Sequence, residues 1–341
     1  MKPCHSSPVR RSAKVGLRLV LTSLILVLPG RLRAAGEARF SSPQAAVDAL
    51  KAAVEARDTN ALHAIFGPTA HDLVSVDVVE AAEERELFVR HLQEKVNLVP
   101  ESDSKEVLQL GADGWPFPIP LVKQDGQWLF DTQAGKEEIL NRRIGENELG
   151  AIRVGRAYVQ AQREYASVDR NGDEVLEYAQ HLRSTPGTRD GLYWSMRTGD
   201  ERSPLGPLVA QARVEGYRQK AKILTDEQSP YHGYYFKILI QQGKQAPGGK
   251  YNYLVNGHMI AGFALVAWPA EWGNTGVMTF IVNQQGKIYQ RNLGPKTPSI
   301  AKAMTTYNPD HTWTVKTSPS RTASWYFLRL TAPETTAASG W

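Results

Sequence analysis

The chain has 341 residues, of which 42% are hydrophobic, with 40 Lys and Arg against 35 Asp and Glu. Seven of these bases and none of the acids lie in residues 1–36, so the rest of the chain carries 33 bases, 35 acids and a formal charge of −2. A nucleic-acid partner is therefore not expected, because it needs a basic patch on the folded part. The only cysteine, Cys4, lies in the same stretch, so a chain that begins at Glu37 has no thiol for a disulfide, a nucleophile or a metal.

Residues 1–36 have the three parts of a cleavable secretory signal peptide. A basic stretch precedes the uncharged apolar run Leu19–Gly30, and small residues at 34–36 allow cleavage before Glu37. The apolar run is shorter than the ~18–20 residues that span a bilayer. We therefore expect a periplasmic or extracellular mature protein without a membrane span. An uncleaved anchor and the twin-arginine route, suggested by Arg10-Arg11, are the alternatives.

Residues 37–135 are predicted to form an α+β domain, with helices first and a small antiparallel meander after them. Ser42 can cap a first helix, and Asp58 can end it and cap a short second helix that stops at Gly67. Asp125-Gly126 is a tight hairpin signal. The remaining predicted elements are a third helix over Val78–Val96 and strands over Glu106–Leu110, Phe117–Lys123 and Gln127–Asp131.

Residues 136–316 are predicted to form a second domain, a long helix packed on an antiparallel sheet. The helix covers Lys136–Ser167, with a break near Gly145, and a short helix over Glu174–Leu182 follows the polar turn 169–173. Residues 317–341 are expected to add a strand and a disordered tail. The strands of the sheet are expected over Tyr234–Gln241, Tyr251–Val255, Met259–Trp268, Met278–Val282 and Lys287–Asn292.

Four unusual strings stand out in the second half of the chain: Ser184–Trp194, Ser203–Pro207, Tyr234–Leu239 and Gly262–Ala270. They resemble an uncharacterised bacterial family, the domain-of-unknown-function family 2950. The similarity extends from Phe40 to Val315. Because that family has no established activity, the resemblance implies a location and a shape but no reaction.

A second resemblance concerns the long helix, with Asn147, Ile152 and Tyr165, and the strand segments 267–270, 276–280 and 285–289. These are similar to the headgroup of type IV pilins, in which a helix covers an antiparallel sheet. Pilin assembly uses a very hydrophobic N-terminal helix half, whereas the corresponding residues of this chain, from Asp131 to Gly145, are charged. The resemblance therefore implies a pilin-headgroup-like fold without filament assembly.

The turn after the long helix is the candidate metal site. Asp169, Asn171 and Asp173 alternate on a tight loop, and Glu177 follows four residues later. Oxygen ligands in this spacing suit Ca²⁺, although the loop lacks the Gly and Glu of the usual calcium pattern at its sixth and twelfth positions. The alternative is a solvated turn in which Asp169 or Asp173 caps the next helix. No other cofactor is expected.

A candidate binding site follows from the long Gly- and Pro-rich loop before the sheet. Its polar and aromatic residues could form a pocket wall, and the aromatic faces could hold a sugar or a peptide, although core packing is the alternative for each of them. Ser299 and Lys302 match a Ser-x-x-Lys pattern without its partner motifs. The candidate binding residues are Arg189, Asp190, Tyr193, Trp194, His232, His258 and Trp268.

No catalytic residue can be assigned from these motifs. The sequence favours an exported protein that acts by non-enzymatic binding or assembly, with an envelope protein or polysaccharide as partner. The alternative is a hydrolase or transferase that acts on cell-envelope polymers. Convergence of Asp190, His232 and His258 in one cleft would favour the enzyme, because acid–base catalysis needs such groups at matched distance.

Overall fold

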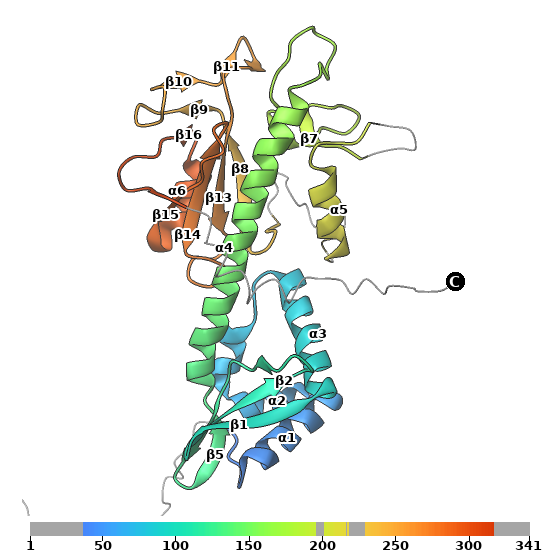
Figure 1. Ribbon diagram of the computed structural model, residues 1–341, viewed down its shortest axis with the longest axis vertical. Helices are drawn as coiled ribbons and strands as arrows, with labels where there is room; N and C mark the ends of the chain where they lie inside the picture. Colours follow the sequence, from blue (N-terminus) through green and yellow to red (C-terminus); the bar gives the residue numbers. More distant parts are fainter. Residues whose placement is uncertain (1–36, 196–200, 216, 218–228, 317–341) are drawn as a thin grey trace, which may run out of the picture. The chain divides into compact units, whose positions relative to one another are not determined.

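The structure is a computed structural model that describes residues 37–195, 201–215, 217 and 229–316 (Figure 1). The predicted signal peptide and the strand and tail predicted after residue 316 lie outside the described residues and stay predictions. Among the helices of these described ranges, none has the length and apolar character that a membrane crossing requires.

The N-terminal helices form where the capping residues predict them. α1 (Pro43–Glu55) begins after Ser42, whose Oγ accepts a hydrogen bond from Ala45 N at 3.2 Å. α2 (Thr59–Phe66) begins after Asp58, whose carboxylate accepts bonds from two first-turn amides. The short 3₁₀ helix η1 (Pro68–Leu73) and the charged helix α3 (Val78–Glu94) follow. A side-chain acceptor at each α-helix start replaces the missing partner of the first amides.

The N-terminal sheet is antiparallel and has the strand order β1-β2-β4-β5, with β3 paired to β2. The predicted turn Asp125-Gly126 joins β4 to β5, and both of its residues have positive φ. β1 was not predicted, because its sequence lacks an apolar alternation and most of its residues are exposed. The strands are β1 (Val96–Ser102), β2 (Lys105–Leu110), β3 (Trp115–Pro116), β4 (Leu121–Gln124) and β5 (Gln127–Phe130).

The long helix α4 (Thr132–Tyr165) connects two hydrophobic cores. Asp131 caps it, the helix begins four residues before the predicted start, and it continues through Gly145 without a break. A glycine inside a helix costs only about 1 kcal/mol relative to alanine, so it does not by itself end one. Ile139 packs against the first core, whereas Ile152 and Tyr158 are buried in the second. The division into two domains stays a prediction.

The C-terminal sheet has five antiparallel strands in the order β17-β15-β14-β13-β8, and α4 packs against β13 and β14 (Figure 1). Every residue of β13 is buried, as expected for a central strand that α6 (Thr297–Ala303) also contacts. The predicted helix on an antiparallel sheet, and with it the α+β class, is confirmed. The strands are β8 (Tyr234–Leu239), β13 (Ala264–Pro269), β14 (Met278–Asn283), β15 (Tyr289–Asn292) and β17 (Thr314–Val315).

Smaller elements surround this sheet. The helix predicted over Glu174–Leu182 does not form, because Tyr178 N donates to Met259 O at 2.8 Å and Ala179 N donates to the Gln162 side chain at 2.8 Å. These distant partners replace the bonds that a helix would make. The smaller elements are β6 (His181–Arg183), β7 (Gly191–Tyr193), α5 (Gly206–Val214), β9 (Gln241–Gln242), β10 (Tyr251–Asn252), β11 (Leu254–Val255), β12 (His258–Met259), η2 (Gly294–Lys296) and β16 (Thr306–Tyr307).

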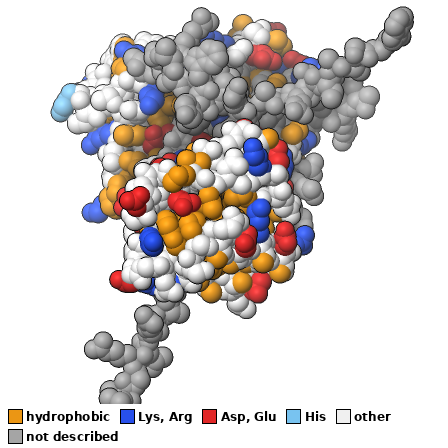
Figure 2. Space-filling model, turned by 60° about the horizontal axis from the view of Figure 1, so that its bottom comes forward, with side chains coloured by type: hydrophobic (Ala, Val, Ile, Leu, Met, Phe, Trp, Pro, Cys, Tyr) orange, Lys and Arg blue, Asp and Glu red, His pale blue; other side chains and the backbone are white. Residues whose placement is uncertain are grey.

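Hydrophobic side chains also reach the surface. Figure 2 shows a group of them in the middle of one face, with acidic and basic side chains around it. Much of any protein surface is apolar, so such a group alone does not identify a binding site.

Candidate metal centre

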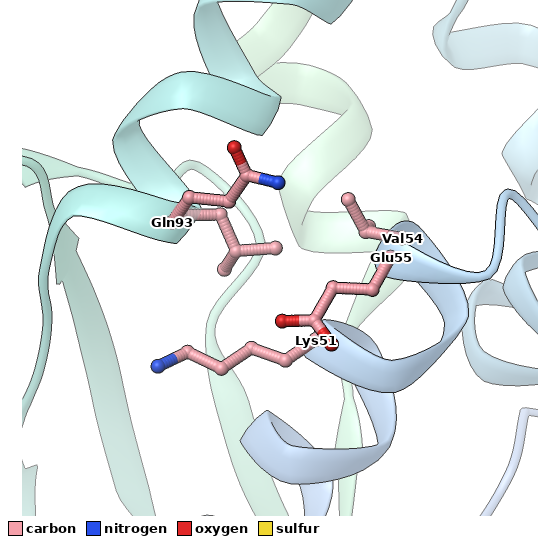
Figure 3. A pocket seen from close by; sticks show the side chains of 5 residues that line it. Lys51, Val54, Glu55 and Gln93 are labelled. Atoms are coloured by element: carbon pink, nitrogen blue, oxygen red, sulfur yellow. The ribbon is translucent and has the colours of Figure 1, made fainter.

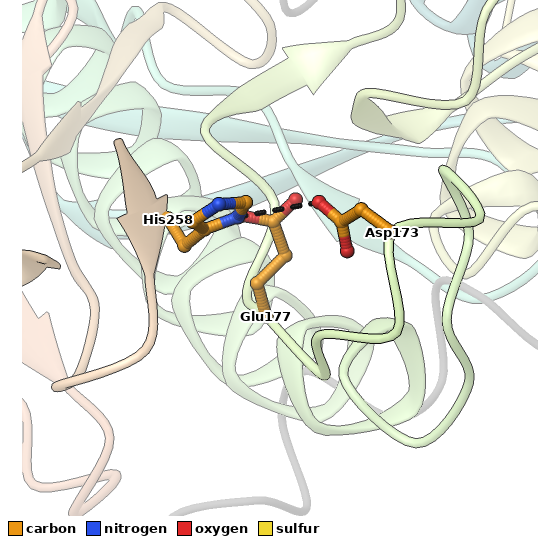
Figure 4. A group of neighbouring side chains, drawn as sticks. All are labelled: Asp173, Glu177 and His258. Carbon is orange, nitrogen blue, oxygen red and sulfur yellow. Dashed lines mark ion pairs between the residues drawn. The ribbon is translucent and has the colours of Figure 1, made fainter. Parts of the chain in front are cut away.

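Two carboxylates from one segment and a histidine that is distant in sequence converge beside the turn after α4. Asp173, Glu177 and His258 each offer one ligand atom, and the three atoms lie within 4.8 Å of one another (Figure 4). His258 Nδ1 lies 3.4 Å from Asp173 Oδ2 and 3.3 Å from Glu177 Oε2. The side chains of Asp173 and His258 are about one-third exposed, whereas that of Glu177 is 15% exposed. The group is therefore open to solvent on one side.

Backbone amides in and just after the polar turn 169–173 hold the carboxylates of Asp169 and Asp173 in place. Asp169 accepts hydrogen bonds from the backbone N–H groups of Gly172 at 2.8 Å and Glu174 at 2.9 Å, and these bonds lower the pKa of its carboxyl group. Asp173 uses Oδ1 in the same way, to accept from Val175 N at 2.9 Å. Asp173 Oδ2 is thereby left to face the histidine.

A two-residue hairpin places the histidine. Asn256 and Gly257 have φ of 52° and 89° and join β11 to β12, so that Val255 pairs with His258. Asn-Gly suits such a turn because both central residues need positive φ. Gln180 Nε2 donates to Gly257 O at 2.7 Å and holds the hairpin against the segment after the polar turn.

The two separations that involve the imidazole nitrogen fit a tetrahedral ion. Two ligands about 2.05 Å from Zn²⁺ at a tetrahedral angle lie about 3.3 Å apart. Both contacts of His258 Nδ1 match that separation. Glu177 Oε2 is buried and makes no hydrogen bond, and it contacts His258 Nδ1 at 3.3 Å. Asn171 Nδ2 donates to Asp173 Oδ2 at 2.8 Å and to Glu177 Oε1 at 3.0 Å, which orients both carboxylates from behind.

The arrangement differs from the predicted calcium site in its ligands. Asp173 and Glu177 do come together, but Asp169 turns toward backbone amides and Asn171 directs its amide nitrogen to the carboxylates. The third converging group is an imidazole. Calcium prefers oxygen ligands, whereas an imidazole with two carboxylates suits zinc and similar divalent transition metals.

Two of the predicted binding residues stabilise their own loop. Trp194 is 7% exposed, and its Nε1 donates to Glu201 O at 3.0 Å. The guanidinium groups of Arg170 and Arg189 lie 5.4 Å and 5.7 Å from its ring centroid, and Glu201 pairs with both of them. These contacts anchor the loop to Tyr165 at the end of α4, whose hydroxyl donates to Arg189 O at 2.6 Å.

The other aromatic and acidic candidates have internal partners as well. Tyr193 is 7% exposed and accepts a bond from Arg213 at 2.7 Å, and Trp268 is 2% exposed in the second core. Asp190 accepts bonds from Thr185 N at 2.8 Å and from Thr188 Oγ1 at 2.7 Å. Ligand binding by these residues stays a prediction.

His232 belongs to a separate polar junction between α3 and the start of β8. Its Nε2 lies 3.1 Å from Glu215 Oε2, and its backbone N donates to Tyr217 Oη at 3.1 Å. Tyr217 in turn donates to Asp77 Oδ2 at 2.8 Å. His232, His258 and Asp190 therefore have three separate sets of partners, so their contacts give no support to the catalytic alternative.

Glu80 makes this junction sensitive to pH. Burial raises the pKa of its carboxyl group to about 7, and repulsion from Glu84 and Asp77 adds to the shift. Since the unfolded pKa is 4.5, the stability that this group contributes is complete below about pH 4.5 and is lost as pH rises toward about 7. We expect the free energy of unfolding to fall by at least about 1 kcal/mol over that range.

Urea unfolding between pH 5 and pH 8 tests this expectation, with Glu80→Gln as the comparison. The variant should show a flatter pH profile, because its amide does not titrate. Glu215 acts in the opposite direction: hydrogen bonds outweigh its burial and lower the pKa of its carboxyl, so its contribution is lost at acidic pH. Parallel profiles for the two proteins would contradict the role of Glu80.

A small pocket lies between α1 and α3 (Figure 3). Its lining residues are Lys51, Val54, Glu55, Leu92 and Gln93. The volume is about 90 Å³. Pockets for small organic ligands usually measure about 300–1,000 Å³. None of the candidate residues lines the pocket, so it receives no functional assignment.

Comparison with protein families identifies one that covers nearly all of the described part of the chain. A family model described as a protein of unknown function, DUF2950, matches residues 37–315. No curated protein and no solved structure matches the chain. The similarity to pilin headgroups is not confirmed. Because the family model covers most of the chain, including the three converging side chains, the protein belongs to the DUF2950 family of proteins of unknown function.

Proposed function

We propose that the protein is an exported metal-binding protein that holds a divalent ion, Zn²⁺, between Asp173, Glu177 and His258. The observation that carries this proposal is the approach of an imidazole nitrogen to two carboxylate oxygens at 3.3 Å and 3.4 Å. Export is supported by the signal-peptide pattern of residues 1–36. It requires the natural protein to begin at or near Glu37.

The ion would act by joining two segments. Asp173 and Glu177 lie on the segment after α4, whereas His258 lies in the β11–β12 hairpin. An ion bound to all three would fix the hairpin relative to the end of the long helix. We propose that the β11–β12 hairpin and the segment after α4, held together by the ion, bind an envelope protein or polysaccharide without catalysis.

Thermal unfolding of residues 37–341 tests the metal site. Zn²⁺ at about one hundred times its dissociation constant should stabilise the folded chain by about 2.7 kcal/mol, and chelator should reverse the effect. His258→Ala should weaken Zn²⁺ binding at least tenfold, because it removes the nitrogen ligand. His63→Ala is the matched control, since His63 is exposed on α2 and should leave binding unchanged.

The same measurement with Ca²⁺ distinguishes the two ions. Stabilisation by Ca²⁺ that survives in His258→Ala would favour the oxygen ligands of the polar turn over the zinc site. Equal melting midpoints in Zn²⁺, Ca²⁺ and chelator would contradict metal binding altogether.

One observation favours a second candidate function, a metal-dependent hydrolase of envelope polymers. Three protein ligands with solvent access leave a coordination position for water, as in catalytic zinc sites. Zinc-dependent release of soluble fragments from isolated cell-wall polymer, lost in His258→Ala, would support the hydrolase over a purely binding role.

A further inference from the structure

The segment between η1 and α3 exposes its apolar side chains and buries its polar ones. Val74, Val76 and Val78 are 54%, 49% and 79% exposed, whereas Ser75 and Asp77 are 5% and 3% exposed. The alternation is the reverse of that in an ordinary half-buried strand. Single exposed aliphatic residues are common, but here three of them occur at every second position, and we call Val74, Val76 and Val78 the apolar strip.

Hydrogen bonds of the buried Ser75 and Asp77 side chains keep the three valine side chains facing solvent. Asp77 Oδ1 accepts from Val79 N at 3.0 Å and caps α3, while Oδ2 accepts from Tyr217 at 2.8 Å and from Gly233 N at 3.3 Å. Ser75 Oγ accepts from Asp77 N at 3.2 Å. Turning the segment over would bury the valines but would break all of these bonds and leave the Asp77 charge unpaired. The apolar exposure is therefore enforced by the network around Asp77.

The strip borders a group of crowded carboxylates. Burial and the neighbouring charge of Glu215 raise the pKa of the Glu83 carboxyl group. Arg143 pairs with Glu84, and His232 pairs with Glu215. Among the residues that the structure describes, Glu83 forms no ion pair. Attraction to His232 offsets only part of the burial and of the repulsion from Glu215, so a cation from another molecule would relieve what remains.

A further exposed aliphatic residue is adjacent in sequence to Glu215. Val214 is 83% exposed at the end of α5 and precedes Glu215. The hydroxyl of Tyr231 donates to Glu215 Oε2 at 3.0 Å, so that carboxylate is held in place. Exposed valines and acidic side chains thus occur together on α3 and at the end of α5.

We propose that Val74, Val76 and Val78, together with Glu83 and Glu215, form a docking surface for an extended peptide segment in which Lys or Arg alternates with aliphatic residues. The two-residue repeat of the strip matches the side-chain repeat of an extended peptide. The acids match the charge of the peptide and would exclude an acidic one. The surface is separate from the proposed metal centre and does not depend on it.

Fluorescence anisotropy tests the proposal with the full chain and a labelled Val-Lys-Val-Lys-Val-Lys peptide. The lysine peptide should bind at least tenfold more tightly than its Val-Glu counterpart, and added salt should weaken its binding. Val76→Ser together with Val78→Ser should weaken binding at least tenfold, and Glu83→Gln should weaken it about threefold.

Val168→Ser is the matched control, because Val168 is 47% exposed elsewhere on the chain. It should bind the lysine peptide as tightly as the original protein. The substituted valines are exposed, so unchanged melting midpoints should confirm that each variant is folded. Equal affinity for the two peptides, no binding of the lysine peptide, or unchanged binding in the double valine variant would overturn the proposal.

Discussion

Replacing Arg143 with Ala is expected to lower the free energy of unfolding by about 3 kcal/mol. The side chain is 1% exposed, and its Nη2 lies 3.1 Å from Glu84 Oε2. Its Nη1 donates to Asn274 Oδ1 at 2.9 Å, and its Nη2 also donates to Leu73 O. One guanidinium thus joins α4 to three other segments. The variant loses these bonds and leaves the partly buried oxygens of Leu73 and Asn274 without this donor.

Urea unfolding measures the loss, and the neighbouring Arg142 supplies the control. Arg142 pairs with Glu138 at 2.7 Å, but its side chain is 32% exposed. Arg142→Ala should therefore cost at most about 1 kcal/mol, as expected for a surface ion pair. Equal losses in the two variants would show that the buried position of Arg143 does not matter.

Replacing Gly233 with Ala is expected to cost about 3 kcal/mol, for two separate reasons. Gly233 has φ +65°, which strains a residue with a Cβ. The added Cβ would also lie 2.6 Å from Asn147 Nδ2 and 2.8 Å from Thr275 Cβ. Neither neighbour can easily move, because both are buried and Asn147 Nδ2 donates to Thr275 O at 3.1 Å.

Gly249→Ala separates the two contributions. Gly249 has a similar φ of +78°, but no atom lies within 4 Å of the position that a Cβ would occupy. This variant should lose only about 1 kcal/mol, the cost of the backbone conformation. A comparable loss in both variants would show that steric crowding around Gly233 is not important.

Local patterns predicted most of the fold. The caps Ser42 and Asp58, the turn at Asp125-Gly126 and the alternation of Tyr234–Leu239 each form the predicted structure. The errors occur where distant partners decide the conformation. The side chain of Gln162 on α4 binds the backbone of Ala179, and this bond favours an extended segment over a helix. Such a partner is not visible from local sequence.

The candidate metal centre was predicted in part, for the same reason. The spacing of Asp173 and Glu177 on one turn indicated a cation site. His258 was assigned to a different site, because only the tertiary structure brings the β11–β12 hairpin to that turn. The Asn256-Gly257 pair was a usable signal, since it predicts a hairpin with a histidine directly after its turn. Which segment the hairpin contacts is not visible from that pair.

A crystal structure grown with Zn²⁺, with anomalous scattering recorded on both sides of the zinc edge, tests the metal centre most directly. The account predicts one ordered zinc ion bound by His258 Nδ1 and by the carboxylates of Asp173 and Glu177, with bonds of about 2.0–2.2 Å. Zinc peaks only at other positions, or no peak between these three side chains, would contradict the account.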